Sequence, residues 1–541
     1  MKNVFTLEFA INNRVLQSIK NYSERFVLPL MLGLLVAISI GNFFQYYFNG
    51  LGLAYNDARS HLDIGRRVVE GLKPGLAQLG SVWLPLPHIL MIPTIWNDFM
   101  WHSGLAGGLQ SMISFVATAL IIYSLLSRLG VGMLGRIVGV AVFVLNPNIL
   151  YLQSIAMTEL LLIATMTAGV YELIMWHKDE QLPQLIRSAF WIMLATLIRY
   201  DGWFLMMLAA ALVVFHAWRK RGYHVAEGAF FLFCTLAGFS VFLWLLWNQL
   251  IFKDALYFAF GPFSARAQQQ QLEEAGVLAT KSNLWFSLSI YLHALIYNSG
   301  AFTAILGAIG AIVFWFDKKI SSSVRIASVA LMAPLLFNVL ALYLGHSVLF
   351  IQGLSGNTWF NVRYGIMLMP AIAVFVGYLV HKLPTLRATL IGLLLLVIAV
   401  SFASGDAVTI DDARVGSSQK NVSEVSGYLK ENAASEKGFI LISAASHDAI
   451  IFSSGLPMKR FIHEGTGAYW ESATTSPDRW ARWIVMRTHD NNDLTWKAVS
   501  VVPTFFDRYT RVAEYPFADV YELNPEWYGS LETEAVIKNN K

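Results

Sequence analysis

The sequence contains little charge and a single cysteine. Only 14% of its 541 residues are charged, whereas globular domains typically carry about 25% charged residues. Because Cys234 has no second cysteine to pair with, an intramolecular disulfide is excluded. The sequence also lacks a P-loop, a G-x-S-x-G pattern, an H-E-x-x-H pattern and paired C-x-x-C patterns, so nucleotide hydrolysis and zinc chemistry have no support among its motifs. These absences argue against a conventional soluble enzyme.

Long apolar runs take the place of the missing charge. Hydrophobic residues make up 56% of the chain and the mean hydropathy is +0.52. About 20 consecutive apolar residues suffice for a helix to cross a bilayer. We therefore expect an α-helical polytopic membrane protein with about eleven spans, the first of them uncleaved because its apolar run is too long for a signal peptide. The expected spans are 26–48, 104–126, 132–148, 155–176, 186–200, 202–218, 226–250, 294–316, 323–345, 362–380 and 386–403.

Basic residues orient these spans. Five short loops rich in Lys and Arg alternate along the chain and fall on the side of the N-terminus, as in Arg219-Lys220-Arg221. The positive-inside rule therefore places the N-terminus in the cytoplasm and the polar C-terminal segment outside. That segment, 404–541, holds only 14 of the 39 basic residues but 19 of the 35 acidic ones. No Lys/Arg stripe interleaved with aromatic residues occurs in it, so we exclude nucleic acid as a partner.

Composition divides the chain into two parts. Residues 1–403 form the expected membrane domain, which includes a long first outer loop at 49–103. Its Pro-rich apolar run, 83–96, is too short to span and is expected to be an interfacial or re-entrant element packed on protein. Residues 404–541 are expected to be a small α/β domain outside the membrane. Its expected elements are a linker to about 417, helices at 422–429, 447–453 and 477–482, strands at 438–443, 459–464 and 483–488, and a hairpin near 512–522.

Two acidic residues stand out on the expected outer side. Asp57 follows the first span and begins an amphipathic stretch, where it could cap a helix or act as a general base. Glu159 opens the fourth span, where the helix dipole favours a negative charge in the first turn. Ionisable groups at the edge of a membrane bundle usually face a cavity. Together the two carboxylates could hold a hard divalent cation, although no spacing pattern supports a metal site here.

Two arginine motifs complete the polar groups of this side. Arg199 and Asp201 lie between two closely spaced spans, where an internal ion pair could simply anchor the turn. Arg363 and Tyr364 open the tenth span. Such an arginine commonly extends to lipid head groups, but it could equally bind a phosphate that enters from the membrane. Position along the sequence does not separate these roles.

The order of these motifs resembles that of the GT-C polytopic glycosyltransferases, in particular those akin to protein O-mannosyltransferases and the lipid A aminoarabinose transferase. The resemblance covers residues 1–403, while the C-terminal part resembles only the variable outer domain that such enzymes append. No Trp-Trp-Asp sequence of the oligosaccharyltransferase branch is present, which disfavours transfer of an oligosaccharide to asparagine. The resemblance is carried by Tyr55-Asn56-Asp57-Ala58-Arg59-Ser60-His61-Leu62-Asp63, Trp83-Leu84-Pro85-Leu86-Pro87-His88, Thr158-Glu159 and Arg363-Tyr364.

The resemblance implies an inverting glycosyltransferase. We expect it in the bacterial inner membrane, although a protein of the endoplasmic reticulum would show the same physical pattern. Its donor would be a polyprenyl-phosphate-linked sugar, and its acceptor a protein, lipid or polysaccharide at the outer face. Asp57 would be the general base, and Arg363 would stabilise the departing lipid phosphate. The implied substrate-binding residues are Glu159, Arg199, Asp201, Arg363, Tyr364 and His61. No cofactor is certain, and a divalent cation remains open.

A transporter or flippase is the main alternative. Many spans with ionisable residues can also form a translocation path. Transporters, however, usually show internal repeats and helices broken near the bilayer midplane. Here no repeat is evident and the polar motifs crowd one surface, which favours chemistry at that surface. A sensor with an outer ligand-binding domain would leave the long first loop unexplained.

Overall fold

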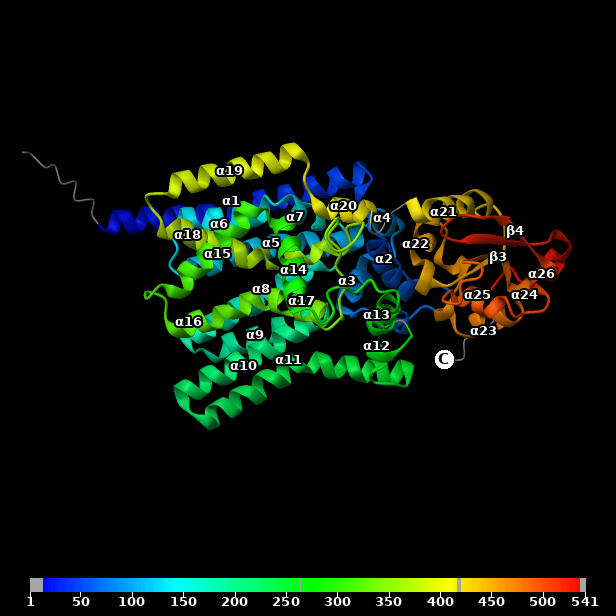
Figure 1. The fold of residues 1–541 in the computed structure, drawn as a ribbon, viewed down its shortest axis with the longest axis horizontal. Coiled ribbons are helices and arrows are strands. Elements are labelled where there is room, and N and C mark those ends of the chain that lie inside the picture. Colours follow the sequence, from blue (N-terminus) through cyan, green and yellow to red (C-terminus); the bar gives the residue numbers. More distant parts are fainter. Residues whose placement is uncertain (1–12, 263, 416–419, 536–541) are drawn as a thin grey trace, which may run out of the picture.

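The computed structural model describes residues 13–262, 264–415 and 420–535. A bundle of long helices forms one end of the molecule and a domain built on a β-sheet forms the other (Figure 1). The helices of the first outer loop lie between these two parts. The α-helical polytopic class and the small C-terminal α/β domain expected from the sequence are therefore confirmed.

Eight helical segments of the described chain are long and apolar enough to cross a membrane. This number is lower than the eleven spans expected from the apolar runs, although each expected span contains a helix. Several segments combine two or three consecutive elements. The eight are Phe26–Phe48 of α1 (Asn13–Phe48), α5 (Leu105–Arg128), α8 (Glu159–Asp179), α10 (Asp201–Arg221), α11 (Tyr223–Phe252), α16 to α17 (Ser322–Tyr343), η4 with α18 (Val362–Lys382), and α19 with α20 (Arg387–Val415).

Three expected spans account for the difference. Helices α6 (Met133–Val144) and α9 (Leu182–Thr196) have 12 and 15 residues, so they are shorter than the bilayer core at 1.5 Å per residue. The span expected at 294–316 is a pair of helices, α14 (Leu284–Ser299) and α15 (Ala301–Phe316), bent by 110°. Gly300 lies at the bend with φ of 78°, a left-handed conformation that favours glycine. An apolar run does not reveal such a bend.

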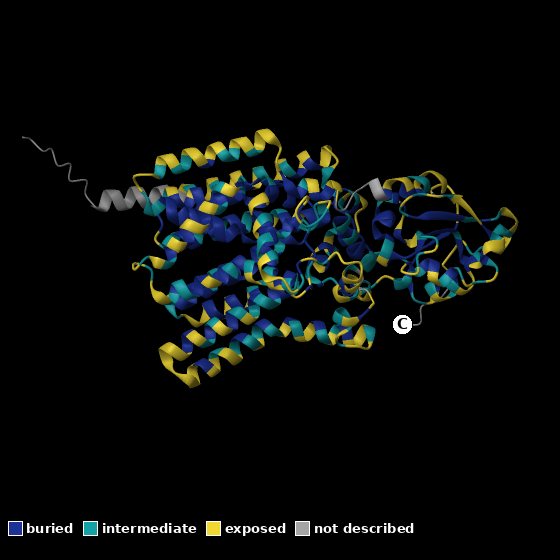
Figure 2. Ribbon diagram, in the orientation of Figure 1, coloured by how far each residue is buried: buried dark blue, intermediate teal, exposed yellow. Residues whose placement is uncertain are grey.

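Glycines allow the central helices to approach closely. A Cβ at Gly377 of α18 would lie 2.6 Å from the carbonyl oxygen of Gly135 in α6. A Cβ at Gly310 of α15 would lie 2.2 Å from the carbonyl oxygen of Phe375 in α18. Small residues at such crossings are typical of membrane helices, which associate through close packing. Helix α18 is thus buried at the centre of the bundle, whereas α19 lies exposed at its edge (Figure 2).

The first outer loop folds into short helices that cover one end of the bundle. They are α2 (Asn56–Val69), η2 (Leu76–Leu79), α3 (Leu86–Ile95) and α4 (Asp98–His102). Met91 and Ile95 of α3 are fully buried against protein. The run at 83–96 is therefore packed on protein as expected, and its polar backbone is satisfied by a helix of only ten residues.

The C-terminal domain is built on a mixed five-stranded sheet with the order β2-β1-β3-β5-β4. Strand β1 (Phe439–Ile442) pairs in parallel with β2 (Phe461–Ile462) and β3 (Ala481–Met486). Strands β4 (Tyr509–Ala513) and β5 (Asp519–Leu523) form the expected hairpin, and β5 also pairs antiparallel with β3. Helices α21 (Lys420–Asn432), α22 (Ala444–Ser454), α23 (Ala468–Thr475), α24 (Pro477–Trp480), α25 (Leu494–Val499) and α26 (Phe505–Arg508) complete the domain.

The segment expected to be a linker is partly helical. Helix α20 (Val408–Val415) lies within the interval 404–417 and contacts α7 (Pro147–Leu152) and η4 (Val362–Leu368) of the bundle. Its Thr409 donates hydrogen bonds from N and Oγ1 to Asn148 Oδ1, at 3.0 and 2.8 Å. The Asp/Ser-rich composition suggested a solvated connector. Composition alone does not reveal that these polar groups have hydrogen-bond partners on the bundle.

Candidate functional site

Helix α2 places Asp57 at the end of the bundle. Asp57 lies in the first turn of α2, where the positive end of the helix favours a carboxylate. Tyr55, the residue before α2, is the N-cap, and its side chain forms no capping hydrogen bond. The Asp57 side chain is 37% exposed. It is therefore the accessible acid of the group described below and can meet a molecule arriving from outside the protein.

Arg363 is the centre of a buried ion-pair cluster. Its Nη2 donates to Asp57 Oδ2 at 2.6 Å and its Nε donates to Glu159 Oε1 at 3.0 Å. Asp412 Oδ2 lies 3.7 Å from Nη1, and the guanidinium stacks 4.9 Å from the ring of Tyr55. Arg363 itself is only 5% exposed. Its charge is thus directed into the protein, so the alternative in which it extends to lipid head groups is not realised.

A second arginine faces the same glutamate. Arg199 Nη1 lies 3.4 Å from Glu159 Oε1, and Arg199 Nε lies 3.3 Å from Asp201 Oδ2. Its guanidinium stacks 4.8 Å from the ring of Tyr364. Glu159 has no exposed surface, so two cations compensate the burial of its charge. The Arg199–Asp201 pair expected at this turn is therefore part of the same cluster.

His61 lies beside the cluster but has a different partner. Its Nδ1 is 2.9 Å from Nε2 of His88, and its ring lies 4.3 Å from that of Trp83. Burial, together with the charges of Arg199 and Arg363, lowers the pKa of His61 to about 3. His61 is therefore neutral at ordinary pH. One histidine of the pair donates a hydrogen bond to the other. His61 lies in α2 and His88 in α3.

Two members of the cluster were not expected from the sequence. Tyr55 Oη donates to Asp412 Oδ2 at 3.1 Å and to the carbonyl of Thr409 at 2.8 Å. Asp412 is 1% exposed. The only signal in the sequence is an Asp-Asp pair at 411–412 between apolar residues. A short helix can bury one of two adjacent acids, but the pair alone does not tell which.

The cluster lies at one end of the bundle. Glu159 begins the 21-residue helix α8 and Asp179 ends it, so about 30 Å separates the two ends of the helix. At the second end Asp179 accepts a hydrogen bond from Arg128 at 2.5 Å, and Glu180 accepts one from Arg221 at 2.5 Å. The basic loops and the Arg363 cluster therefore occupy opposite ends, as the charge pattern predicts.

The suggestion of a cation site gains no support from this geometry. Among the described residues no group of three or more His, Cys, Asp or Glu side chains is arranged to hold a metal ion. Asp57 and Glu159 instead both bind Arg363, whose guanidinium lies between them. The side chains present form a site of alternating carboxylates and guanidinium groups, which suits binding of hydroxyl groups and phosphate.

Solved structures of similar fold place this site in a known architecture. ArnT from Cupriavidus metallidurans bound to undecaprenyl phosphate has a TM-score of 0.54 at 11% identity, over 91% of this chain and 98% of that chain. Its apo state gives 0.52 at 11% identity, over 90% and 98%. The chain has the GT-C fold. Archaeal AglB from Archaeoglobus fulgidus, in complex with an inhibitory peptide and a dolichol-phosphate, gives 0.50 at 11% identity, over 93% and 75%.

The GT-C fold is recognised here from shape. No protein-family model and no curated sequence matches the chain, and the solved GT-C structures share 11% of their residues with it. ArnT and AglB are both membrane glycosyltransferases. In this GT-C chain, α2 and the start of α8 bring Asp57 and Glu159 to Arg363 at the end of the bundle that adjoins the sheet domain.

Proposed function

We propose that the chain is a glycosyltransferase that moves a sugar from a polyprenyl-phosphate carrier to a hydroxyl group of an acceptor. The observation that carries this proposal is the contrast between Asp57 and its partner. Asp57 is 37% exposed, whereas Arg363, which binds it, is 6% exposed at its side chain. An accessible carboxylate can meet the acceptor hydroxyl group and take its proton. The similar structures of ArnT bound to undecaprenyl phosphate and of AglB in complex with a dolichol-phosphate support the donor class.

The proposed reaction is a single displacement with inversion. Asp57 takes the proton of the acceptor hydroxyl while the oxygen of that hydroxyl attacks the anomeric carbon. The bond from this carbon to the phosphate oxygen breaks, and its electron pair leaves with the polyprenyl phosphate. Arg363 and Arg199 stabilise the negative charge that grows on the phosphate. The protein supplies the base, the positive charge and the alignment of the two substrates.

The remaining residues hold this arrangement. Glu159 fixes both guanidinium groups, since its Oε1 lies within 3.4 Å of each. Asp201 and Tyr364 position Arg199 from two sides. Neutral His61 offers a polar wall next to the arginines. We assign these side chains to substrate binding and alignment, and the proton transfer to Asp57 alone.

The setting of the reaction follows from the charge pattern. We propose a bacterial inner-membrane protein whose N-terminus and basic loops face the cytoplasm and whose residues 404–541 form a separate domain at the outer face. The donor would reach the site laterally from the bilayer, and the acceptor would be a protein, lipid or polysaccharide. Helix α20 joins the two parts and contributes Asp412 to the cluster, so the outer domain is well placed to influence substrate binding.

The Asp57→Asn variant tests the proposal. Asparagine is nearly isosteric but cannot act as a base, so transfer should fall by about 10²-fold or more, as is typical when a general base is lost. The measurement compares envelope glycans and lipid-linked sugars by mass spectrometry in a deletion strain that expresses either wild type or the variant at equal levels. One glycan should disappear while a polyprenyl-phosphate sugar accumulates.

The control is Asp254→Asn, an exposed outer-loop carboxylate whose side chain caps a neighbouring backbone N–H. It should give the wild-type profile. A deletion strain that changes while Asp57→Asn does not would show that Asp57 is not the base. The flippase alternative would be favoured by two results together. Deletion would remove the lipid-linked sugar from the outer leaflet, and membranes of the deletion strain would still form the transfer product in vitro.

A further inference from the structure

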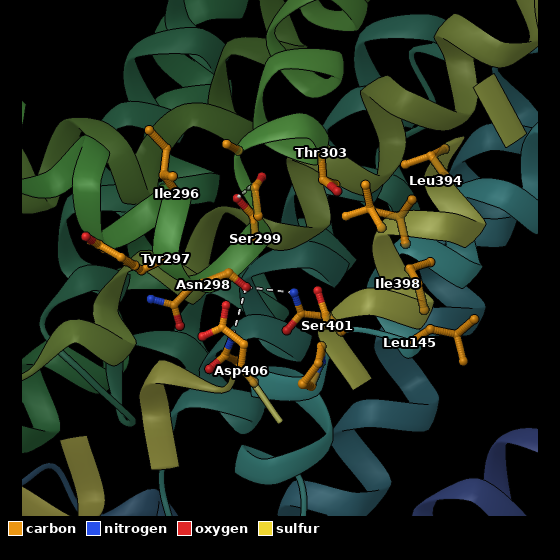
Figure 3. A pocket seen from close by; sticks show the side chains of 17 residues that line it. Leu145, Ile296, Tyr297, Asn298, Ser299, Thr303, Leu394, Ile398, Ser401 and Asp406 are labelled. Atoms are coloured by element: carbon orange, nitrogen blue, oxygen red, sulfur yellow. Dashed lines mark hydrogen bonds between the residues drawn. The ribbon is translucent and has the colours of Figure 1, made fainter. Parts of the chain in front are cut away.

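A cavity lies behind the Arg363 cluster, at the bend between α14 and α15. Its volume is about 220 Å³, enough for several water molecules at about 30 Å³ each. The end of α6, the start of α7, the α14–α15 bend and the inner side of α19 surround it (Figure 3). The residues labelled in the view are Leu145, Ile296, Tyr297, Asn298, Ser299, Thr303, Leu394, Ile398, Ser401 and Asp406.

One side of the cavity offers unpaired polar groups. Because Gly300 interrupts the helix, the N–H groups of Ala301, Phe302 and Thr303 have no backbone acceptor in the described chain. Thr303 is only 6% exposed, and its hydroxyl group forms no hydrogen bond with the described residues. Ser401 of α19 also lines the cavity, and its hydroxyl group forms no hydrogen bond with the described residues. Asn298, which also lines the cavity, is 1% exposed, and its Oδ1 has no hydrogen-bond partner among the described residues. A buried polar group normally has a partner, so the lining indicates a ligand or water.

The other side of the cavity is apolar and adjoins the membrane. Leu394 and Ile398 of α19 line it, while Leu393 and Leu396 on the outer side of the same helix are 41% and 58% exposed. Helix α19 lies at the edge of the bundle (Figures 1 and 2). In a bilayer this exposed surface contacts lipid. A molecule with an apolar chain can therefore reach the cavity sideways, past α19.

The charge of the lining restricts the head group. None of the seventeen lining residues is Lys, Arg or His, and the single charged one is Asp406, which is exposed at the rim. An anionic head group would find no cation and would meet Asp406. A cationic head group would meet the positive end of α15. Hydroxyl groups can both accept from the N–H groups and donate to the carboxylate, so an uncharged hydroxylated head group fits both sides.

We propose that this cavity binds the uncharged, hydroxylated head group of a membrane lipid, such as a glycolipid. This inference stands apart from the proposed transfer reaction, because it concerns a different cavity and needs no catalysis. Two hydrogen bonds link the cavity to the cluster. Asn298 Nδ2 donates to the carbonyl of Val362 at 2.7 Å, next to Arg363, and Asn148 Oδ1 accepts from Thr409 at 2.8 Å in α20. A bound lipid therefore contacts groups that support Arg363 and Asp412.

Photo-cross-linking of the full-length protein tests this site. Nanodiscs of phosphatidylcholine would contain a trace of either glucosyl diacylglycerol or phosphatidylglycerol, with the same diazirine-bearing acyl chains. Mass spectrometry of peptides then locates the cross-links. We expect the glucosyl lipid to label segments 296–303 and 394–401, and phosphatidylglycerol to label them several-fold less. The double variant Thr303→Val, Ser401→Ala keeps the cavity volume nearly unchanged but removes both hydroxyl groups, so labelling should fall by about tenfold or more.

Leu396→Ala serves as the matched control, since it changes the outer side of α19 and should keep the labelling of these segments by the glucosyl lipid. Ile398→Trp fills the cavity from its apolar wall and should abolish this labelling even if the double variant does not fold. Equal labelling of wild type, the double variant and Ile398→Trp would overturn the proposal. Preferential labelling by phosphatidylglycerol would overturn the assignment of an uncharged head group.

Discussion

At the scale of single residues, burial separates the carboxylates of the Arg363 cluster by role. Glu159 has no exposed surface and contacts two guanidinium groups, whereas the side chain of Asp57 is 37% exposed and contacts one. Removing one partner of a buried pair leaves an uncompensated charge and typically costs about 3–5 kcal/mol. An exposed pair typically contributes less than about 1 kcal/mol. We therefore expect Glu159 to support the fold of the site and Asp57 to serve its chemistry.

Thermal unfolding in detergent tests this separation. Glu159→Gln should lower Tm by several degrees, because Arg199 and Arg363 lose their shared counter-charge. Asp57→Asn should lower Tm less than Glu159→Gln, because the Asp57 side chain is partly solvated and Glu159 still compensates the charge of Arg363. The matched control is Glu172→Gln in the same helix, whose partner Arg187 has a side chain 54% exposed; it should leave Tm nearly unchanged. Equal losses for Asp57→Asn and Glu159→Gln would contradict the division of roles.

Several of these residues could be named from the sequence because membrane chains contain few ionisable groups. Asp57, Glu159, Arg199, Asp201 and Arg363 each stand beside an apolar run, and the structure brings them together. Asp412 could not be named, since the acids of its segment resemble those of a solvated connector. His61 is near the cluster as expected, but its pairing with His88 depends on how α2 and α3 fold against each other.

At the scale of elements, α20 connects the outer domain to the site through Tyr55. The Tyr55 hydroxyl group donates to Thr409 and Asp412, both in α20. Tyr55→Phe keeps the ring beside Arg363 but leaves two acceptors without this donor. Each lost hydrogen bond to a charged or buried group typically costs about 1–3 kcal/mol. We expect a lower Tm and faster proteolysis between residues 404 and 437.

Tyr46→Phe provides the control for this variant. Tyr46 is also buried, and its ring packs edge-on against Tyr151, which lies beside Tyr55 as well. The hydroxyl group of Tyr46 forms no hydrogen bond with the described residues. Its substitution should leave both Tm and the proteolysis rate unchanged. If Tyr55→Phe behaved like Tyr46→Phe, α20 would be held by contacts other than the tyrosine.

The close crossing of α6 and α18 makes a second prediction at this scale. Gly377→Ala places a methyl group 2.6 Å from the Gly135 carbonyl oxygen, so the two helices must separate. The variant should lose Tm and fold poorly, because overpacking a tight interior typically costs about 1–3 kcal/mol. Gly392→Ala in α19 has nothing within 4 Å of the added methyl group and should be neutral or slightly stabilising. Expression and Tm of the two variants measure the difference, and equal behaviour would contradict it.

Sequence patterns predicted the elements better than their boundaries. Each apolar run contains a helix, yet the bend at Gly300 and the short α6 and α9 arise from packing between helices that are distant in sequence. In the outer domain the alternation of strands and helices gave the α/β class. The order β2-β1-β3-β5-β4 depends on contacts between distant segments and was not predicted.

At the scale of the whole molecule, the outer domain meets the bundle through a buried group of charges on α2 and α22. Arg67 of α2 donates to Asp448 of α22 at 2.7 Å. Asp63, one turn earlier in α2, is fully buried and faces Asp448. Arg67 thus pairs with Asp448, while Asp63 accepts a hydrogen bond from the Trp101 indole N–H at 3.0 Å. Glu464 and His463 from the adjoining turn also face this group.

This arrangement makes the interface sensitive to pH. Burial raises the pKa of Asp448 to about 6, and burial together with the Asp448 charge raises the pKa of Asp63 well above its ordinary value. Groups with raised pKa values bind more protons in the docked state than after separation, where carboxyl groups titrate near 3.9. These two carboxyl groups therefore stabilise the interface most below about pH 4. Their contribution is lost as the pH rises through 6.

Proteolysis of the segment between residues 404 and 437, measured from pH 5 to pH 8 with a protease active across this range, tests the effect. Wild type should be cut faster at pH 8 than at pH 5. The control variant Asp507→Asn changes an exposed residue of the same domain and should be cut at the wild-type rate at every pH. Asp63→Asn should weaken this dependence, because it removes one of the two carboxyl groups with raised pKa values and leaves Asp448 paired with Arg67. Replacing both groups, in Asp63→Asn, Asp448→Asn, should weaken it further, and a dependence of wild-type size in this double variant would assign the effect to other groups.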